Sequence, residues 1–438
     1  MKNPTSSVIA LGSKIFKSSL FRAAGTYGFF SLLNKVIPFL LLPVMTRYLT
    51  PRDYGYTAVF SVMVALITPF IGFNTPGAYV RAYYAQGRFE MPRYLGTVFC
   101  FVVVSGIGTS CLLYPFRELI GQTFSFPVAW LWSVPVVATA ASFVLLTLSS
   151  WRVRELPWPY GLFQNSQTLA GVTGAILFVV VLGMAWQGRI LSQVIVTSLF
   201  AFLGICFIVK NKWITLSFDS KYLRHALCFG IPLIPHSLSG ILNTSIDRVF
   251  ITHMVGMADT GLYTVGYQIG MIINLIATAF NQAYVPWLYR KLNEDSCEIK
   301  RKIVKMTYVY FGAILLGTLF FSFTAPYLMR LMLGAEFKES SRYILWIALG
   351  YAFNGMYFMV VSYIFYAEKT AFLALATVTG ALINIVLNYF LIKSNGAIGA
   401  AQATTLTYFF IFLMVWFLST RMYSMPWFDF WKKDRDNL

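Results

Sequence analysis

Few side chains in this sequence are able to do chemistry, and the charged ones stand out because they lie inside long apolar stretches. Stretch 229–253 carries Asp247 and Arg248, and stretch 24–46 carries Lys35. Ammonium and guanidinium groups bind phosphate or carboxylate groups, and a carboxylate binds a cation or a proton. An ionised group near the centre of a membrane helix costs about 2.5 to 3.5 kcal/mol on insertion scales. These three residues are therefore candidates for a binding or coupling site.

Uncharged polar side chains form stripes beside these charges. At 100° per residue, the stripe of stretch 229–253 falls within an arc of about 100°. A stripe facing lipid would leave its donors and acceptors unsatisfied, so each stripe should face other helices or water. The sequence predicts that the three stripes converge on one cavity. They consist of His236, Ser239, Gly240, Asn243 and Asp247; of Tyr267, Asn274, Thr278, Asn281 and Gln282; and of Tyr27, Ser31, Asn34 and Pro38, with Lys35 at the margin.

Alternatives stay open for each kind of residue. The amides and hydroxyls either contact a substrate or bond one helix to another. Because neighbours on a helix diverge by 100°, Asp247 is predicted to continue its stripe while Arg248 pairs with a neighbouring helix or reaches the external surface. The alternative is a buried ion pair that fixes helix packing. Lys35 lies too far from either interface to snorkel easily, so it needs an acidic partner or, the interpretation we favour, a water-filled cavity.

Catalytic chemistry finds no site in the sequence. There is no phosphate-binding GxxxxGK[ST] motif and no HExxH motif, and the chain has only three histidines. Asp247 is the only carboxylate well inside the apolar stretches, so paired acid–base catalysis has no second partner. We predict a protein that is not an enzyme and has no cofactor and no metal, although coupling to an ion gradient or to the membrane potential stays open.

The composition places these residues in a membrane. The 438 residues are 58% hydrophobic and only 11% charged, against about 25% charged in soluble domains, and the mean hydropathy is +0.67. The apolar residues fall into runs of about twenty, the length of a membrane-spanning helix. The net charge of +18 is explained by membrane topology, and no nucleic-acid partner is expected.

The sequence predicts an all-α polytopic membrane protein with about twelve transmembrane helices. Lys and Arg accumulate on the cytoplasmic side. With the N-terminus inside, the cytoplasmic segments hold 24 Lys and Arg and the external segments hold 8, so both termini are predicted to be cytoplasmic. The expected helices are 24–46, 54–73, 95–113, 128–148, 162–184, 190–209, 229–253, 262–285, 308–329, 343–366, 371–392 and 397–420.

An internal repeat divides the chain into two similar halves. At an offset of about 206 residues, the Asp53-Tyr54-Gly55 turn overlays Asp259-Thr260-Gly261. This predicts two pseudo-symmetric six-helix bundles around a central cavity, a layout known among transporters. The predicted domains are 1–215, which includes a short interfacial segment at 1–22, and 216–438, which includes a basic cytoplasmic tail.

Motifs at the start of both halves resemble a known family. They are Tyr27-Gly28, Pro38, Pro43, Arg47-Tyr48-Leu49, Pro51 and Tyr54-Gly55 in the first half, and Phe229-Gly230-Ile231-Pro232, Asp247-Arg248, Gly256 and Gly261-Leu262-Tyr263 in the second. The chain resembles the Wzx-type O-antigen and polysaccharide flippases of the multidrug/oligosaccharidyl-lipid/polysaccharide superfamily. Each motif is degenerate, but together with length and helix count the resemblance spans the chain.

The resemblance implies both a fold and a function. The fold would be similar to that of the multidrug (MATE) antiporters of the same superfamily. The function would be translocation of an undecaprenyl-pyrophosphate-linked oligosaccharide, an O-antigen or similar repeat unit, from the cytoplasmic to the periplasmic leaflet of the bacterial inner membrane by alternating access. The partners would be this substrate and membrane lipids, with an O-antigen polymerase and a chain-length regulator as candidates. The site would comprise Lys35, Asn34, Tyr27, Asn243, Asp247, Arg248, Tyr267, Asn274, Asn281 and Gln282.

Two other functions are considered. A drug or cation antiporter would share the fold, but the resemblance then leads us to expect an acidic cation site in the first bundle, where no carboxylate lies well inside the helices. An O-antigen polymerase would be an enzyme with a large external loop, whereas the external loops here are short. Neither alternative fits the residues as well as the flippase.

Overall fold

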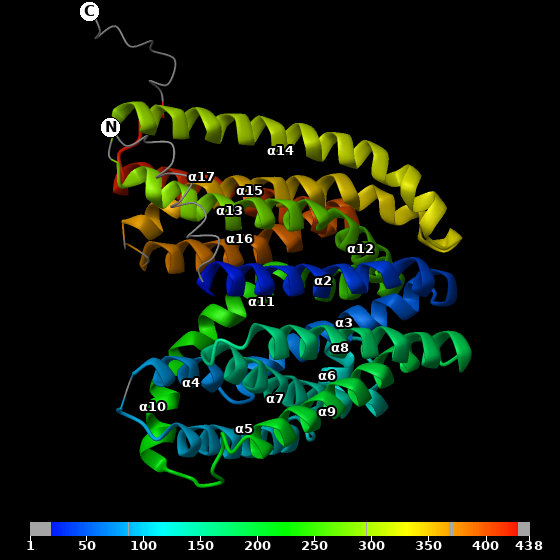
Figure 1. Cartoon of the computed structure of the whole chain (residues 1–438). Coiled ribbons are helices and arrows are strands. Elements are labelled where there is room, and N and C mark those ends of the chain that lie inside the picture. Colours follow the sequence, from blue (N-terminus) through cyan, green and yellow to red (C-terminus); the bar gives the residue numbers. More distant parts are fainter. Residues whose placement is uncertain (1–18, 86, 295, 368, 370, 428–438) are drawn as a thin grey trace, which may run out of the picture. The chain divides into compact units, whose positions relative to one another are not determined.

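The computed structural model describes residues 19–427 except Gln86, Asp295, Glu368 and Thr370. Within this part of the chain the secondary structure is helical, without a strand (Figure 1). Twelve helical segments are long and apolar enough to cross a membrane, so the predicted number of spans is confirmed and the chain is a multi-pass membrane protein. The predicted segment 1–22 lies largely outside the described residues, as does most of the predicted basic tail.

The helices follow one another with short connections, and each predicted span overlaps at least one long helix. In chain order they are α2 (Ser19–Tyr48), α3 (Pro51–Ile67), η1 (Thr68–Phe70), α4 (Thr75–Tyr84), α5 (Met91–Leu113), α6 (Arg117–Thr123), η2 (Val128–Trp130), α7 (Ser133–Val153), α8 (Pro157–Ala175), η3 (Ile176–Val181), α9 (Ala185–Lys210), α10 (Ser220–Gly230), η4 (Ile231–Leu233), α11 (Ile234–Met254), α12 (Met257–Gly270), α13 (Ile272–Leu292), α14 (Cys297–Met332), η5 (Ala335–Tyr343), α15 (Ile344–Tyr366), α16 (Ala371–Asn395) and α17 (Ala397–Met422).

The chain divides into two compact units. Unit 1 comprises residues 1–49 and 63–234, and unit 2 comprises residues 50–62 and 235–438. The first part of α3 therefore belongs to unit 2, although it precedes most of unit 1 in the sequence. The predicted domain boundary at 215/216 stays a prediction.

Unit 1 is built on two helix pairs. The first helix of the chain, α2, packs against α8, and α7 packs against α9. The α2–α8 pair is parallel, because residues further along α2 contact residues further along α8: Tyr27 meets Tyr160, and Asn34 meets Thr168. The short helices α4 and α10 pack against each other and against α5.

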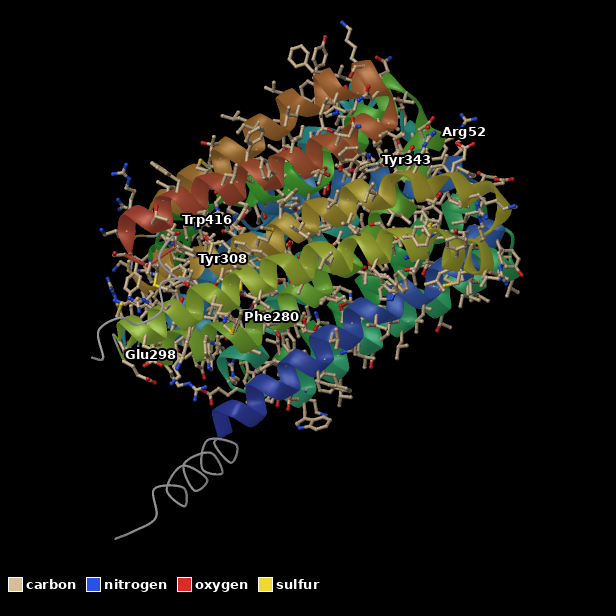
Figure 2. The ribbon with its side chains drawn as sticks, turned by 90° about the horizontal axis from the view of Figure 1, so that it is seen from above. Arg52, Phe280, Glu298, Tyr308, Tyr343 and Trp416 are labelled. Atoms are coloured by element: carbon tan, nitrogen blue, oxygen red, sulfur yellow. The ribbon has the colours of Figure 1, made fainter. Side chains whose placement is uncertain are left out.

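Unit 2 is centred on α15, which packs against α13, α14 and α17, while α16 packs against α17. In Figure 1 these helices run alongside one another, with α14 at the edge of the unit. Aromatic rings close one end of the bundle, where Tyr308, Trp416 and Trp427 pack edge to face and the Tyr308 hydroxyl donates to the Trp427 carbonyl oxygen over 3.1 Å. Figure 2 shows Tyr308 and Trp416 at this end and Tyr343 towards the opposite end.

A reciprocal contact within unit 2 confirms the predicted repeat at its turn. A Cβ atom added to Gly55 on α3 would lie 2.1 Å from the Met257 carbonyl oxygen, and one added to Gly261 on α12 would lie 1.8 Å from that of Pro51. Gly55 and Gly261 are 206 residues apart, and so are Pro51 and Met257. Each repeat thus contributes the same glycine and the same carbonyl to the contact, as an approximate twofold axis requires.

Hydropathy did not predict three short helices, or the interruptions of predicted helices at η4 and at Met271. The helices α4, α6 and α10 are too short to span a membrane, and α10 is amphipathic. A search for apolar runs of about twenty residues does not detect elements of this kind. The predicted helix 262–285 was wrong as a single element, because the chain breaks at Met271 into α12 and α13.

Candidate functional site

Asp247 and Arg248 form an ion pair inside unit 2. An Arg248 Nη1–H donates to Asp247 Oδ1 over 2.8 Å and to the Thr244 carbonyl oxygen over 2.5 Å. The exposed fraction is 2% for Asp247 and 9% for Arg248. Arg248 was predicted to pair with a neighbouring helix or to reach the external surface, but its ion-pair partner is its own neighbour, because the long arginine side chain folds back along α11. The alternative interpretation, a buried ion pair, is the one found.

Three tyrosines surround this pair and belong to two other helices. The Tyr263 hydroxyl donates to Asp247 Oδ2. The Arg248 guanidinium carbon lies 4.2 Å from the ring centre of Tyr267, and the Tyr351 hydroxyl donates to that of Tyr267 over 2.6 Å. We call these five residues the Asp247 cluster. Their elements are α11 for the ion pair, α12 for Tyr263 and Tyr267, and α15 for Tyr351.

The Asp247 cluster is electrically balanced and internally satisfied. The carboxylate accepts from two side chains, and the guanidinium lies over an aromatic face, which attracts a cation. A buried ion pair of this kind contributes little by itself, but removing one partner leaves an uncompensated buried charge that costs about 3–5 kcal/mol. The cluster therefore fixes the packing of α11 on α12, and the charge of Arg248 is already compensated by Asp247.

The predicted amides of unit 2 serve different neighbours. Asn243 donates to the Thr377 carbonyl oxygen of α16 over 3.4 Å, and Asn274 accepts from Asn354 of α15 over 3.2 Å. Asn274 thus takes the alternative role of bonding one helix to another. Because the predicted helix 262–285 breaks at Met271, its polar stripe is not one continuous surface. The side-chain amide oxygen of Asn281 is buried without a partner, and Gln282 is exposed.

The predicted residues of unit 1 lie along the contact between α2 and α8. The ring of Tyr27 lies 5.1 Å from that of Tyr160, and the Tyr27 hydroxyl is buried without a partner. Asn34 donates to the Thr168 hydroxyl over 2.5 Å and to the Gln164 carbonyl oxygen over 3.3 Å. Lys35, next to it, lies on the exposed face of α2, and in the described part of the chain it forms no ion pair.

The sequence prediction missed several polar residues in both units. In α8, the side-chain oxygens of Gln164 and Asn165 are buried and accept no hydrogen bond, although both Asn165 amide hydrogens are donated, to the carbonyl oxygens of Phe30 and Gly161. The side-chain oxygens of Asn243 and Asn281 are likewise buried and accept no hydrogen bond in the described part of the chain. The predicted helix 162–184 contains both α8 residues, so a search for amide pairs inside apolar stretches would have found them.

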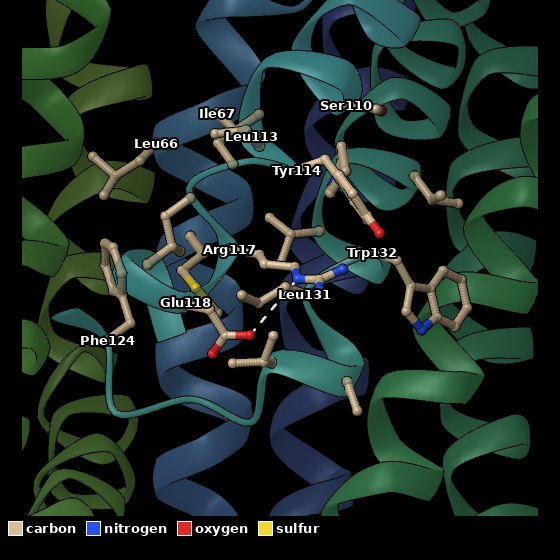
Figure 3. Close-up of a pocket in the computed structure, with 17 residues that line it drawn as sticks. Leu66, Ile67, Ser110, Leu113, Tyr114, Arg117, Glu118, Phe124, Leu131 and Trp132 are labelled. Carbon is tan, nitrogen blue, oxygen red and sulfur yellow. Dashed lines mark ion pairs between the residues drawn. The ribbon is translucent and has the colours of Figure 1, made fainter. Parts of the chain in front are cut away.

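A pocket in unit 1 contains none of the predicted site residues. It has a volume of about 660 Å³ and lies among α3, α5, α6 and α7. Figure 3 shows its apolar lining, which includes Leu66, Leu131 and Trp132, with the Arg117–Glu118 ion pair of 3.7 Å among the lining residues. So largely apolar a lining suits a hydrocarbon chain.

No metal centre is found in the described part of the chain, where no group of three or more His, Cys, Asp or Glu side chains is suitably placed to hold an ion.

Comparison with known sequences identifies similar proteins along most of the chain. The profile of the family described as "Polysaccharide biosynthesis protein" matches residues 44–342. "Lsg locus putative protein 1" of Haemophilus influenzae is 25% identical and covers 85% of this chain and 90% of its own. "Capsular polysaccharide biosynthesis protein CapF" of Staphylococcus aureus is 21% identical over 90% and 97%. "Putative O-antigen transporter" of Shigella flexneri is 22% identical over 60% and 62%.

Solved structures share the fold. The lipid II flippase MurJ in an inward closed conformation superposes with a TM-score of 0.71 at 17% identity, over 92% of this chain and 87% of that one. An inward-facing multidrug resistance MATE family transporter of the MOP superfamily also has a TM-score of 0.71, at 14% identity over 88% and 94%. The predicted MATE-like fold is confirmed.

Proposed function

The chain belongs to the family of polysaccharide biosynthesis proteins, and from this premise we propose that it is a flippase for an oligosaccharide carried on undecaprenyl pyrophosphate. The observation that carries the proposal is the family match, which covers about two thirds of the chain. The fold that it shares with a lipid II flippase supports a transport role. The substrate would be an O-antigen or similar repeat unit.

The chemistry of this cargo fits the polar residues of both units. Its pyrophosphate is an anion and its sugars carry many hydroxyls, so crossing bare hydrocarbon would incur a large desolvation cost. Lys35 is the unpaired cation of the predicted site, and we assign to it the first contact with the pyrophosphate. The unpaired acceptors of Gln164, Asn165 and Asn281 would receive sugar hydroxyls.

Arg248 takes a different role from Lys35 in this mechanism. Its charge is compensated by Asp247 at 2.8 Å, so its attraction for a distant anion is weak. We propose that the Asp247 cluster holds α11 and α12 as one rigid element while the bundles rock. Substrate contact would then come from Thr244 and His236, which are exposed and lie on the same side of α11 as the ion pair.

Direction and location complete the proposal. The protein would lie in the bacterial inner membrane with both termini in the cytoplasm. An interior-negative potential favours outward movement of an anion by about 2.3 kcal/mol per charge per 100 mV, so no catalytic step and no cofactor is required. A polymerase and a chain-length regulator would act on the delivered units, and either is a candidate binding partner.

The test is delivery of lipid-linked oligosaccharide to the outer leaflet in cells that lack the protein, compared with cells that carry the intact gene. Cargo should accumulate on the cytoplasmic side, and the gene should relieve this. Single units that are exposed outside but fail to polymerise would identify a polymerase instead. Unchanged delivery together with altered drug sensitivity would identify an antiporter.

A further inference from the structure

Helix α10 in unit 1 has one packed face and one free face. On the packed face, the His225 ring lies 4.6 Å from the Phe89 ring, and His225 Nδ1 lies 3.0 Å from the Tyr94 hydroxyl. Asp219 caps the helix by accepting from the backbone N–H of Lys221 over 2.8 Å. These contacts fix the rotation of α10, so its opposite face is held outwards.

The free face combines an apolar groove with cations. The groove has a volume of about 460 Å³ and is lined by Leu223, Leu227 and Ile231, with Arg224 among them. At 100° per residue these four side chains fall within an arc of about 100°. Just before the helix, Leu216 and Phe218 are 71% and 61% exposed. A cation within an apolar strip is typical of a helix that lies at a membrane surface.

The charge of this region is strongly positive. The side chains of Lys221 and Arg224 form no ion pair within the described residues, and the nearest carboxylate in sequence, Asp219, is engaged in the helix cap. Three parts of the chain together carry seven cations and two carboxylates: α10, the segment before it, and the residues from α4 to the start of α5. The cations are Arg81, Arg88, Arg93, Lys210, Lys212, Lys221 and Arg224, and the carboxylates are Glu90 and Asp219.

The position of α10 brings this face to the level of lipid headgroups. The candidate span that contains it is Ser220–Met254, which has 35 residues, whereas about 20 suffice to cross the hydrocarbon. The residues beyond this length lie on the α10 side of η4, and Pro232 and Pro235 interrupt the helix at this point. The groove is therefore within reach of both a phosphate group and an acyl chain.

We propose that the free face of α10 binds an anionic glycerophospholipid of the bilayer, with its phosphate at Lys221 and Arg224 and one acyl chain along Leu223, Leu227 and Ile231. The positive charge selects an anionic headgroup, and the apolar floor distinguishes this site from one for free phosphate. The site is independent of the proposed cargo and of the Asp247 cluster.

The experiment is native mass spectrometry of the full-length protein, delipidated in detergent and titrated with phosphatidylglycerol or with phosphatidylcholine of the same chains. Phosphatidylglycerol should bind more tightly. Each cation contributes about fivefold in affinity, the factor that corresponds to ~1 kcal/mol per charge near the surface. Arg224→Gln should therefore weaken phosphatidylglycerol binding about fivefold, and the double variant with Lys221→Gln about 25-fold. Phosphatidylcholine binding should not change.

Matched controls separate the site from general effects of charge. Lys393→Gln removes an exposed cation from α16 in unit 2 and should leave binding unchanged, while Arg224→Lys should retain it. Phosphatidylglycerol with six-carbon chains should bind more weakly than the long-chain lipid because it cannot fill the groove.

Three results would overturn the proposal. The first is equal binding of the two headgroups by the wild-type protein, and the second is equal loss of phosphatidylglycerol in Lys393→Gln and Arg224→Gln. The third is a preference that appears only after deletion of residues 2–17, which would assign the groove to that segment. Export of oligosaccharide is not measured, so failure here leaves the flippase proposal intact.

Discussion

The two membrane cations of the predicted site, Lys35 and Arg248, have opposite surroundings. The sequence places both in apolar helices, and the cost of burying an unpaired charge identified them as informative. The structure pairs Arg248 with Asp247 and leaves Lys35 on an exposed face of α2. Residue type and spacing identified both positions as candidates for a binding or coupling site. They did not predict which cation has its charge compensated, because this depends on how an arginine side chain folds along its own helix.

Replacing Lys35 with Ala should abolish outward delivery of the cargo while leaving the protein folded in the membrane. The reason is that the unpaired ammonium has no structural partner to lose. Delivery is measured by outer-leaflet oligosaccharide and folding by the yield and elution of purified protein. Lys35→Arg keeps the charge and should retain most of the activity. Wild-type delivery by Lys35→Ala would refute the role of this lysine.

Replacing Arg248 alone should destabilise unit 2 more than replacing the whole ion pair. Arg248→Ala leaves the Asp247 carboxylate buried and uncompensated, at a cost of about 3–5 kcal/mol. The double variant Asp247→Asn, Arg248→Met removes both charges and should cost less. Unfolding in detergent measures both, with Arg421→Ala, an exposed arginine of α17, as the control. A similar midpoint for Arg248→Ala and Arg421→Ala would contradict the expectation.

At the scale of elements, the long apolar helices were predictable and the short polar ones were not. Segment 343–366 was placed within one residue of α15, because a continuous apolar run has sharp ends. Helix α10 was missed, because its pattern alternates over only eleven residues, and the Met271 break was missed, because no proline marks it. The neighbours of Asn274 and Asn243 depend on which helices pack together, which one sequence does not specify.

The contact between α3 and α12 should not tolerate a side chain at either glycine. Gly55→Ala and Gly261→Ala each place a methyl group against a backbone oxygen at about 2 Å, which should cost about 1–3 kcal/mol. Because the two glycines share one contact, the double variant should cost less than the sum. Unfolding midpoints in detergent measure the effect.

The matched control for these variants is Gly240→Ala on α11. Nothing lies within 4 Å of a Cβ atom at Gly240, so alanine there should be neutral or stabilising by up to about 1 kcal/mol, the difference in helix propensity. If all three variants behaved alike, the close approach of α3 and α12 would have no energetic consequence.

For the whole molecule, the number of helices and the family could be predicted, but the arrangement of the predicted site could not. Apolar length sets the number of spans, and degenerate motifs sufficed for the family. The predicted residues lie in two units, with Tyr27, Asn34 and Lys35 in unit 1 and the others in unit 2. Whether the three stripes meet in one cavity stays a prediction, since it depends on tertiary packing that helical periodicity does not encode.

The predicted topology gives a test at this scale. A phosphatase that is active only outside the cytoplasm should be inactive when fused after Asn293, between α13 and α14, and active when fused after Gly334, between α14 and α15. The reason is the excess of Lys and Arg in the predicted cytoplasmic segment 286–307, between the predicted spans 262–285 and 308–329. A cytoplasmic enzyme reporter at the same two positions should give the opposite pattern. Activity of the phosphatase at both positions would contradict the twelve-span arrangement.

The reciprocal contact of Gly55 with Met257 and of Gly261 with Pro51 bears on the ancestry of the chain. Six helices are an even number, so each half begins and ends on the same side of the membrane, and two separate copies of one half would insert in the same orientation. A single half already carries both the glycine and the carbonyl that the contact needs. A half-length ancestor could therefore have met a copy of itself across this surface as a symmetric homodimer, and fusion of its duplicated genes would have preserved the contact unchanged.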